Sequence, residues 1–310
     1  MSHVRRERWI AFFILLPSIL LIALFVYGFI AWTGVVSLSQ WDTVMPDYRW
    51  AGLENFRRLF EQAQGVAARR FAIDLWNTLF FTILFLLLCV GVGLLLAILL
   101  DQKVKGEGVF RTIYLFPMAL SFVVTGVVWQ WIFAPGTANY PRGVNALLHG
   151  LGLDALRWKW YTDTSGIGPF HKALIPVILA AAWQLIGYTM AMYLAGLRGI
   201  PEELREAARV DGASEVGIYR HIVMPILQPI TLSALIILGH TSLKIFDLIY
   251  TMTGAGPAFA TDVPGIFMFE TTFQGNHYAQ GAAISIIMLV LVALVIVPYL
   301  VSTFRREVQL

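Results

Sequence analysis

The stretch 206-EAARVDGASEVGIYRHIVMP-225 is polar and basic, and it lies between two apolar segments at about 173–196 and 230–253. Each of these apolar segments has roughly the 20 residues that a helix needs to cross the hydrocarbon core of a bilayer. A polar, helix-forming element between two such segments is held at the membrane surface. The sequence therefore predicts a docking element on one face of a membrane protein.

Hydrophobic residues make up 58% of the chain and charged residues only 13%, a composition far from that of a soluble domain. Backbone polar groups in lipid are satisfied only in helices or closed barrels. We therefore expect an all-α, polytopic helical bundle that forms a single transmembrane domain over residues 1–310. The six expected spans are at about 9–32, 77–100, 112–133, 173–196, 230–253 and 281–303.

Basic residues close to span ends indicate which side of the membrane is cytoplasmic. Six spans place both termini on one side, and we expect that side to be the cytoplasm. The basic residues that support this orientation are Arg5, Arg6, Arg8, Lys103, Lys105, Arg111, Arg198, Arg205, Arg209, Arg220, Arg305 and Arg306. The other basic residues lie mostly in two loops of about 40 residues, where the rule is weak.

Several function classes find no support in the sequence. The net charge is only +3 and the basic residues lie beside spans, which argues against a nucleic-acid partner. No G-x-x-x-x-G-K-[ST] phosphate-binding loop, no H-E-x-x-H motif and no nucleophile elbow occurs. We expect no catalytic residue, no metal site and no bound cofactor, so any ATP and Mg²⁺ would be held by another subunit. The single cysteine, Cys89, excludes an intrachain disulfide.

The polar loop at about 197–229 has the pattern of two short helices joined at a glycine. Pro201 suits a first helical position, two glutamates follow it, and Gly212 can end the first helix. The expected face of the first helix consists of Leu204, Ala207, Ala208 and Asp211. The expected face of the second consists of Val216, Tyr219, Ile222 and Val223, and Pro225 and Pro229 then lead into the next span.

Small residues in this loop let a partner's backbone approach closely, and a carboxylate can meet a basic partner group. The small residues are Ala207, Ala208 and Ala213, and the carboxylate is that of Glu206. The alternative is a plain surface loop whose alanines favour helix and whose charges are solvated. Residue chemistry alone leaves both open.

The string E-A-A-x-x-D-G-A followed by I-x-x-P resembles the signature of permease subunits of binding-protein-dependent ABC importers. The matching residues are Glu206, Ala207, Ala208, Asp211, Gly212, Ala213, Ile222 and Pro225. The likeness continues in 52-GLEN-55, 77-NT-78, 111-RTIYLFP-117, 129-WQW-131, 143-GVN-145, 183-WQLIGYTMAMYLAGLRGIPEEL-204 and 246-FDLIYTMTGAGP-257. These strings are similar to the carbohydrate branch of that family, the maltose-type and glycerol-phosphate-type permeases.

The resemblance implies the type I ABC importer permease fold in a bacterial or archaeal inner membrane. It implies that the alanine-rich loop docks in a cleft of a cytoplasmic ATPase, with Glu206 as the contact and Gly212 as the elbow. It also implies an ATPase dimer, a second permease that makes a heterodimer, and an external solute-binding protein. The substrate implied is a sugar. The sequence of the fifth span and of the loop after it is similar to that of permeases for glucose or mannose.

Polar residues within the expected spans are candidates for the translocation path, since intramembrane charges are costly. Lys244 and Asp247 lie three residues apart, and His240 lies four before Lys244, so we expect one shared helical face. If the span starts at about residue 230 on the cytoplasmic side and rises 1.5 Å per residue, His240 lies roughly 15 Å and Lys244 roughly 21 Å from that surface. A Lys–Asp ion pair that only fixes helix packing is the alternative.

Aromatic and amide side chains lie at similar depth in the preceding span. Trp183, Gln184 and Tyr188 suit a sugar, whose hydroxyls need hydrogen-bond partners and whose ring face packs on aromatic rings. The loop 253-TGAGPAFATDVPG-265 is rich in Gly, Ala and Pro, so we expect a tight loop near an outer gate, with a plain connection as the alternative.

The function expected from this sequence is a permease subunit of an ATP-driven sugar importer that works by alternating access. Two rivals stay open at this point. An ion-coupled secondary transporter would use Lys244 and Asp247 as its coupling site and would transport without an ATPase. A membrane enzyme acting on lipid-linked sugar would need interfacial acid–base residues, which the sequence lacks.

Overall fold

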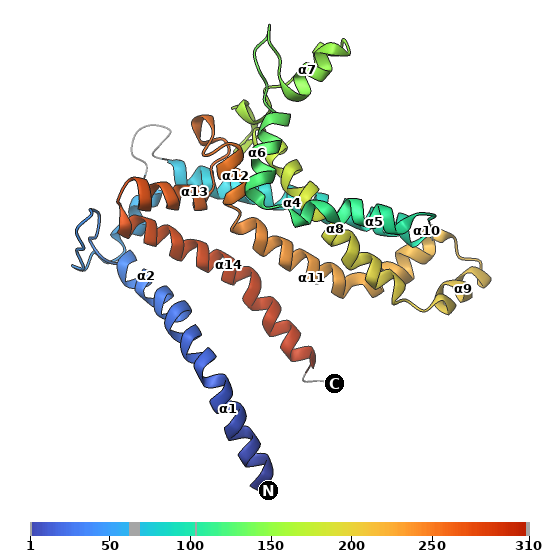
Figure 1. The fold of residues 1–310 in the computed structure, drawn as a ribbon, viewed down its shortest axis with the longest axis horizontal. Coiled ribbons are helices and arrows are strands. Elements are labelled where there is room, and N and C mark those ends of the chain that lie inside the picture. The colour runs from blue at the N-terminus through green and yellow to red at the C-terminus, as the bar shows by residue number, and fades with distance from the viewer. Residues whose placement is uncertain (1, 62–68, 103, 308–310) are drawn as a thin grey trace. The chain divides into compact units, whose positions relative to one another are not determined.

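The computed structural model describes residues 2–61, 69–102 and 104–307. Lys103, one of the basic residues used for orientation, lies outside the described residues. The chain separates into two compact units, one of residues 1–62 and 268–289 and the other of residues 63–267 and 290–310. Figure 1 shows that helices dominate both, as the composition predicts.

The first unit begins with a long apolar helix that is continuous across a π-helical turn. Its elements are α1 (Ser2–Ile22), η1 (Ala23–Gly28), α2 (Phe29–Ser37), α3 (Glu54–Phe60), η8 (Glu270–Gln274) and the start of α14 (Tyr278–Glu307). Side chains of the Phe12–Ser37 span are exposed along most of its length, as expected for a helix that faces lipid. Asn55, only 3% exposed, anchors α3 by donating from Nδ2 to the carbonyls of Ser37 and Ser39.

The second unit holds most of the apolar helices, the polar loop and a cap of residues 134–172 (Figure 1). We call the parts of this unit away from the polar loop outer and the parts beside it inner. Its elements up to the cap hairpin are α4 (Arg70–Asp101), α5 (Glu107–Leu115), η3 (Phe116–Ala119), α6 (Phe122–Ile132), α7 (Gly143–Gly150), η4 (Asp154–Leu156), η5 (Trp160–Thr162), β1 (Gly166–Ile167) and β2 (Phe170–His171). The two short strands pair antiparallel. The remaining elements are α8 (Leu174–Arg198), α9 (Glu202–Val210), α10 (Glu215–Ile218), η6 (Tyr219–Val223), α11 (Met224–Leu243), α12 (Asp247–Met252), η7 (Pro257–Phe259) and α13 (Pro264–Phe269).

Five helices in the described residues are long and apolar enough to cross a membrane, and a bent pair makes a sixth. The five are Phe12–Ser37, Arg70–Asp101, Leu174–Arg198, Glu215–Leu243 and Tyr278–Pro298. The all-α expectation is therefore confirmed.

The expected span at 112–133 is the bent pair, in which Glu107–Ala119 and Phe122–Ile132 meet at 101°. Pro117 lies in the 3-10 turn before the bend and removes one backbone donor. Ser121 then starts α6 as its N-cap, accepting from the amide of Val124 at 3.2 Å. Gln184 donates from Nε2 to the Leu120 carbonyl at 2.7 Å, which satisfies an acceptor that the bend exposes.

The expected span at 230–253 is divided between two helices. The helix begins at Glu215, so the polar loop continues directly into it, and it stops at Leu243 before a short α12. Thr241 and Ser242 donate from their hydroxyls to the carbonyls of Ile237 and Gly239, and such back-bonding bends and weakens helices. An apolar run does not reveal a break of this kind.

The outer halves of the two broken spans pack on each other through a glycine. A Cβ at Gly126 on α6 would collide with the Thr251 hydroxyl and lie 2.9 Å from the Leu248 carbonyl on α12. Only a residue without a side chain allows this approach.

Two apolar clusters stabilise the second unit. The first lies where α4, α8 and the segment from α11 to α13 meet, and includes Phe81, Phe85, Val177, Ile178, Leu248 and Ile266. The second lies beside the polar loop and includes Ala97, Leu100, Tyr193, Leu197, Ile200, Ile218, Val223 and Leu227. The polar loop therefore rests on an apolar base.

Candidate functional site

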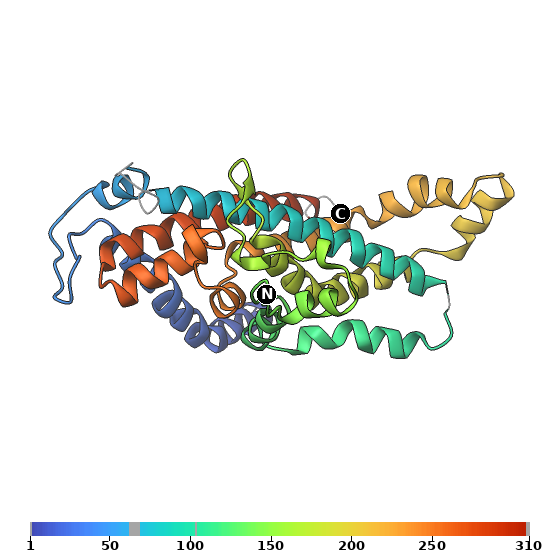
Figure 2. The ribbon, with the colours of Figure 1, turned by 90° about the horizontal axis from the view of Figure 1, so that it is seen from above.

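The polar loop forms two helices that project at one end of the second unit (Figures 1 and 2). The first helix, α9, ends at Val210 and is terminated by Gly212, whose φ of 81° is a left-handed conformation that glycine adopts without strain. The Gly212 amide donates to the Arg209 carbonyl at 3.0 Å, and the Ala213 amide donates to the Ala208 carbonyl at 2.9 Å. This is the Schellman arrangement, and it confirms Gly212 as the end of the helix.

The second helix begins at once and runs without a gap into the membrane span. Ser214 caps α10 by accepting from the Gly217 amide at 3.2 Å. α10 continues through the π-helical η6 into α11, with Pro225 in the first turn of α11. Movement of this helix therefore passes directly to the span.

The residues grouped on each expected face differ in their exposure. On α9, Leu204, Ala207 and Asp211 are exposed, and Arg205 and Ala208 turn inward. On α10, Val216 is 77% exposed, and Ile218 is buried in its place. The helices rest on a narrow inner face because the apolar base contacts only one side of each.

We call a set of seven exposed residues between positions 206 and 216 the coupling surface. It combines small and apolar side chains with two carboxylates, those of Glu206 and Asp211, and Val210 and Val216 are 87% and 77% exposed. Its members are Glu206, Ala207, Val210, Asp211, Gly212, Ala213 and Val216, all exposed. Of the other residues predicted for this site, Ala208 and Ile222 are half-buried and Pro225 is exposed in the first turn of α11. Exposed apolar side chains of this kind mark an interaction surface.

The candidate path residues do not form one cluster. Lys244 and Asp247 lie on either side of the break between α11 and α12, so the predicted shared helical face was wrong. Both are exposed, and no ion pair joins them in the part of the chain described. His240 is half-buried on α11.

The three path candidates on α8 divide between two faces. Trp183 is 39% exposed and meets Trp129 edge to face at 5.6 Å, and Tyr188 is half-buried. Gln184, in contrast, is 3% exposed and is used to hold the bend at Leu120. Its amide therefore has a structural role.

Sequence reasoning missed a buried polar network at the outer end of α4. Asn77, fully buried, donates from Nδ2 to the carbonyls of Phe259 and Asp262 at 3.0 and 2.9 Å. Its Oδ1 accepts from Nδ1 of His171 at 2.9 Å. The network fixes the loop between α12 and α13, where Ala258 and Phe259 have φ of 53° and 61°.

An ion pair strengthens this network. Arg70 donates from Nε to Oδ2 of Asp262, whose side chain is fully buried. The guanidinium also lies over the rings of Phe259 and Phe267, 4.6 and 4.5 Å from their centroids. We call the contacts of Arg70, Asn77, His171 and Asp262 the outer latch. The strings 77-NT-78 and 253-TGAGPAFATDVPG-265 were noted, but nothing in them shows that they meet.

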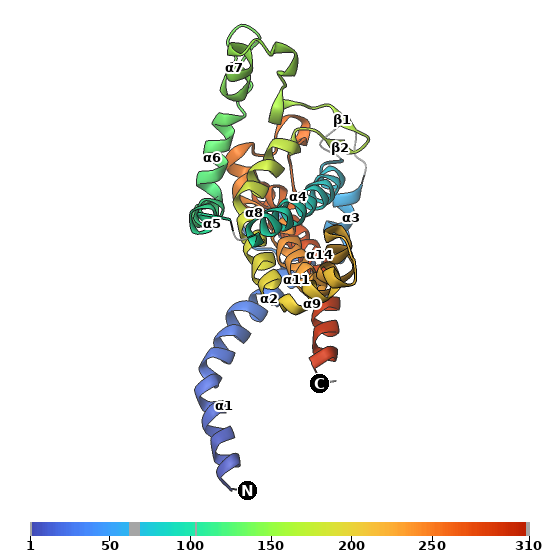
Figure 3. The ribbon, with the colours of Figure 1, turned by 90° about the vertical axis from the view of Figure 1, so that its right-hand side faces the viewer.

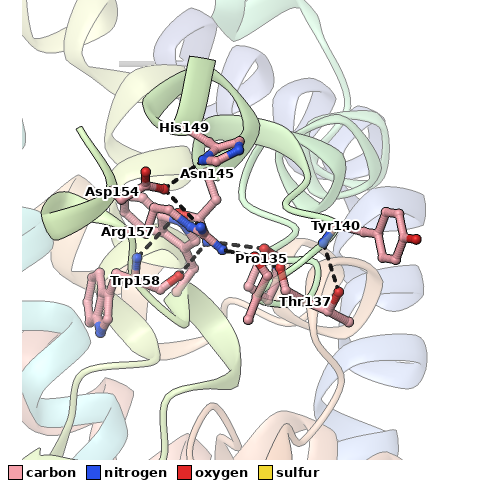
Figure 4. Close-up of polar contacts among 10 residues, drawn as sticks. Pro135, Thr137, Tyr140, Asn145, His149, Asp154, Arg157 and Trp158 are labelled. Carbon is pink, nitrogen blue, oxygen red and sulfur yellow. Dashed lines mark hydrogen bonds and ion pairs between the residues drawn. The ribbon is translucent and has the colours of Figure 1, made fainter. Parts of the chain in front are cut away.

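The outer cap is built around a third buried asparagine (Figure 4). Asn145 donates from Nδ2 to the carbonyls of Pro135 and Trp158 at 3.1 and 2.8 Å, and its Oδ1 accepts from the Trp158 amide. Arg157 and His149 bind Asp154, and these hydrogen bonds hold the pKa of Asp154 below its usual range. Figure 3 shows the cap at the far end of α6. No cluster that could hold a metal occurs among the described residues.

Comparison with known proteins places these features in one family. The model for the binding-protein-dependent transport system inner membrane component matches residues 89–308. A probable ABC transporter permease of Pyrococcus horikoshii is 40% identical over 293 residues, covering 94% of this chain and 95% of that protein. The xylose/arabinose import permease of Haloferax volcanii is 35% identical, covering 92% of this chain and 85% of that protein.

A third relative, a trehalose/maltose transport system permease of Thermococcus litoralis, is 32% identical and covers 97% of this chain and 96% of its own length. Among solved structures, a bacterial ABC transporter involved in import of the polysaccharide alginate superposes with a TM-score of 0.78. It covers 98% of both chains at 23% identity, which supports the fold. The chain is therefore a membrane permease and belongs to the family of binding-protein-dependent transport system inner membrane components.

Proposed function

We propose that this permease is one of two different permease subunits of an ATP-driven sugar importer in the inner membrane of a bacterium or archaeon. A sugar substrate is supported by the xylose/arabinose and trehalose/maltose relatives. In this proposal an ATPase dimer binds ATP and Mg²⁺ in the cytoplasm, and an external binding protein delivers the sugar. Both termini lie in the cytoplasm, on the side of the coupling surface.

The coupling surface is the observation that carries the proposal. Its exposed valines and alanines lie on the same two helices and turn as Glu206, and the turn at Gly212 holds the two helices together. A partner that covers these apolar side chains removes them from water, and a basic group on it can pair with the Glu206 carboxylate. The proposed docking residues are Glu206, Ala207, Ala208, Asp211, Gly212, Ala213, Ile222 and Pro225.

For the sugar path we propose a smaller set than the sequence suggested. Its members have exposed or half-buried side chains: Trp183, Tyr188, His240, Lys244 and Asp247. Aromatic faces and charged groups are the chemistry that sugar rings and hydroxyls need. Gln184 is left out because the bend at Leu120 uses its amide.

Co-purification with the cognate ATPase tests the coupling surface. We expect the native chain to retain the ATPase, and Glu206→Lys and Gly212→Pro to lose it while still inserting into the membrane. Glu203→Lys is the matched control, because it makes the same charge change on α9 outside the coupling surface. Uptake by the native chain with no ATPase attached would overturn the proposal and favour an ion-coupled transporter.

A further inference from the structure

The turn between α4 and α5 is bound to the polar loop by an ion pair. Asp101 is the last residue of α4, and its Oδ2 accepts from Nη1 of Arg205 on α9 at 2.8 Å. The two side chains are only 9% and 11% exposed. Nη2 of Arg205 also donates to the Leu197 carbonyl at 3.1 Å, near the end of α8. One guanidinium therefore joins α9, α4 and α8.

The other end of the same turn is held by a second pair. Glu107 begins α5, and its Oε2 accepts from Nη2 of Arg198, the last residue of α8, at 2.6 Å. Arg111 also pairs with Glu107. This cluster is more exposed than the Asp101 pair, so water screens it more.

Apolar contacts hold the same parts together beneath the charges. Ile200 and Ile218 of the polar loop belong to one buried cluster with Ala97 and Leu100 of α4. A polar cavity of about 560 Å³ lies beside the pair and is lined by Asp101, Arg205 and Tyr219. Nε of Arg205 has no hydrogen-bond partner among the described residues, Asp101 supplies the carboxylate that hydrogen-bonds its guanidinium, and Glu215 interacts with the same charge at longer range.

The chain connects the polar loop covalently to α8 and α11 alone. The helices α4 and α5 can follow a movement of the loop only through noncovalent contacts. Separating Asp101 from Arg205 would leave two largely buried charges uncompensated, which is strongly unfavourable. The pair therefore moves as one body, and a displacement of α9 is passed to the end of α4.

We propose that Arg205 is a positioning residue that transmits movement of the coupling surface to the turn between α4 and α5, and through it to both of those helices. This inference rests on the proposed function, in which an ATPase moves the coupling surface. It assigns Arg205 and Asp101 a part in coupling that is separate from the docking contact at Glu206.

Hydrogen–deuterium exchange on the assembled transporter, with and without ATP and vanadate, tests this inference without knowledge of the sugar. In the native complex we expect ATP to change exchange both in 206–216 and in 104–111. Arg205→Met should keep the response in 206–216 and reduce the response in 104–111 by about threefold, the size that coupling between contacting groups commonly has. Arg220→Met is the matched control, an exposed arginine on η6 with no ion pair among the described residues.

A charge exchange distinguishes transmission from general damage. The double variant Asp101→Arg with Arg205→Asp should restore the response in 104–111, and Asp101→Asn should reproduce the loss if Arg205→Met fails to insert. An unchanged response in 104–111 with Arg205→Met or Asp101→Asn would overturn the inference. Absence of any ATP response in 206–216 of the native complex would instead refute the docking proposal on which it rests.

Discussion

The two ends of the second unit differ in whether their side chains find partners within the chain. At the outer end, the loop between α12 and α13 finds partners for its polar groups within the chain, through Asn77 and the Arg70–Asp262 pair. At the inner end, the coupling surface leaves Val210 and Val216 in contact with water. The outer end is complete in one chain, whereas the inner end needs a partner to cover it.

The largest expected effect comes from breaking the outer latch. Arg70→Met leaves the fully buried carboxylate of Asp262 without its guanidinium, and should lower the free energy of unfolding by about 3 kcal/mol. Denaturant titration in detergent measures this. Arg209→Met, which breaks the exposed pair with Glu215 on the polar loop, is the control and should leave the transition in place. Equal losses in both variants would remove the contrast between the two ends.

A second variant separates the amide from the ion pair. Asn77→Ala removes both donors from the buried carbonyls of Phe259 and Asp262, which should cost about 2 kcal/mol. The same titration measures it. Asn139→Ala is the control, because Asn139 is exposed on the cap. If the two variants are equally stable, the Asn77 contacts of the outer latch do not hold the loop between α12 and α13.

At the inner end we expect a smaller loss of stability and a larger loss of docking. Gly212→Ala puts a Cβ on a residue with φ of 81°, where it meets no neighbour, so the strain of about 1 kcal/mol is purely conformational. ATPase retention should fall while the unfolding transition moves little. Gly212→Asn should be milder, since asparagine tolerates this conformation better than alanine. Full retention by Gly212→Ala would show that the elbow is not needed for docking.

The smallest expected effect is a pH dependence of the outer latch. Burial lowers the pKa of His171 below its ordinary value of about 6.5, so the folded chain binds fewer protons there than the unfolded chain. The stability contributed by neutral His171 is therefore full above that ordinary value and is lost as the pH falls through it. Unfolding measured at stepwise lower pH should show this slope, and His171→Gln should flatten it. An unchanged slope in the variant would assign the pH dependence to other groups.

Local patterns in the sequence were enough to predict the elements that neighbouring residues decide. The apolar runs gave the all-helical spans, and Gly212 ended α9 as the pattern indicated. The break after Leu243 could not be predicted, because it lies in an apolar run and Thr231 and Ser233 make the same hydroxyl–carbonyl bonds in the unbroken part of that helix. It also separated Lys244 from Asp247, which the sequence placed on one helix face.

The polar partners across the fold were also out of reach of the sequence. Asn77 binds carbonyls at 259 and 262, and neither string shows that the other lies beside it. The exposure of Val216 and the burial of Ile218 could not be predicted either, since a short helix with several apolar residues does not reveal which one meets the base. The docking and path residues stay predictions.

Three connecting segments of this permease are held by the same kind of contact, in which a buried asparagine donates to two backbone carbonyls. The asparagines are Asn55, Asn77 and Asn145. A carboxamide carries donors and an acceptor but no titratable proton. An aspartate of the same shape would repel the carbonyls whenever it ionised. The hydrogen bonds that these three asparagines donate therefore persist over a wide pH range, and the pH dependence of the outer latch comes from its titratable member, His171.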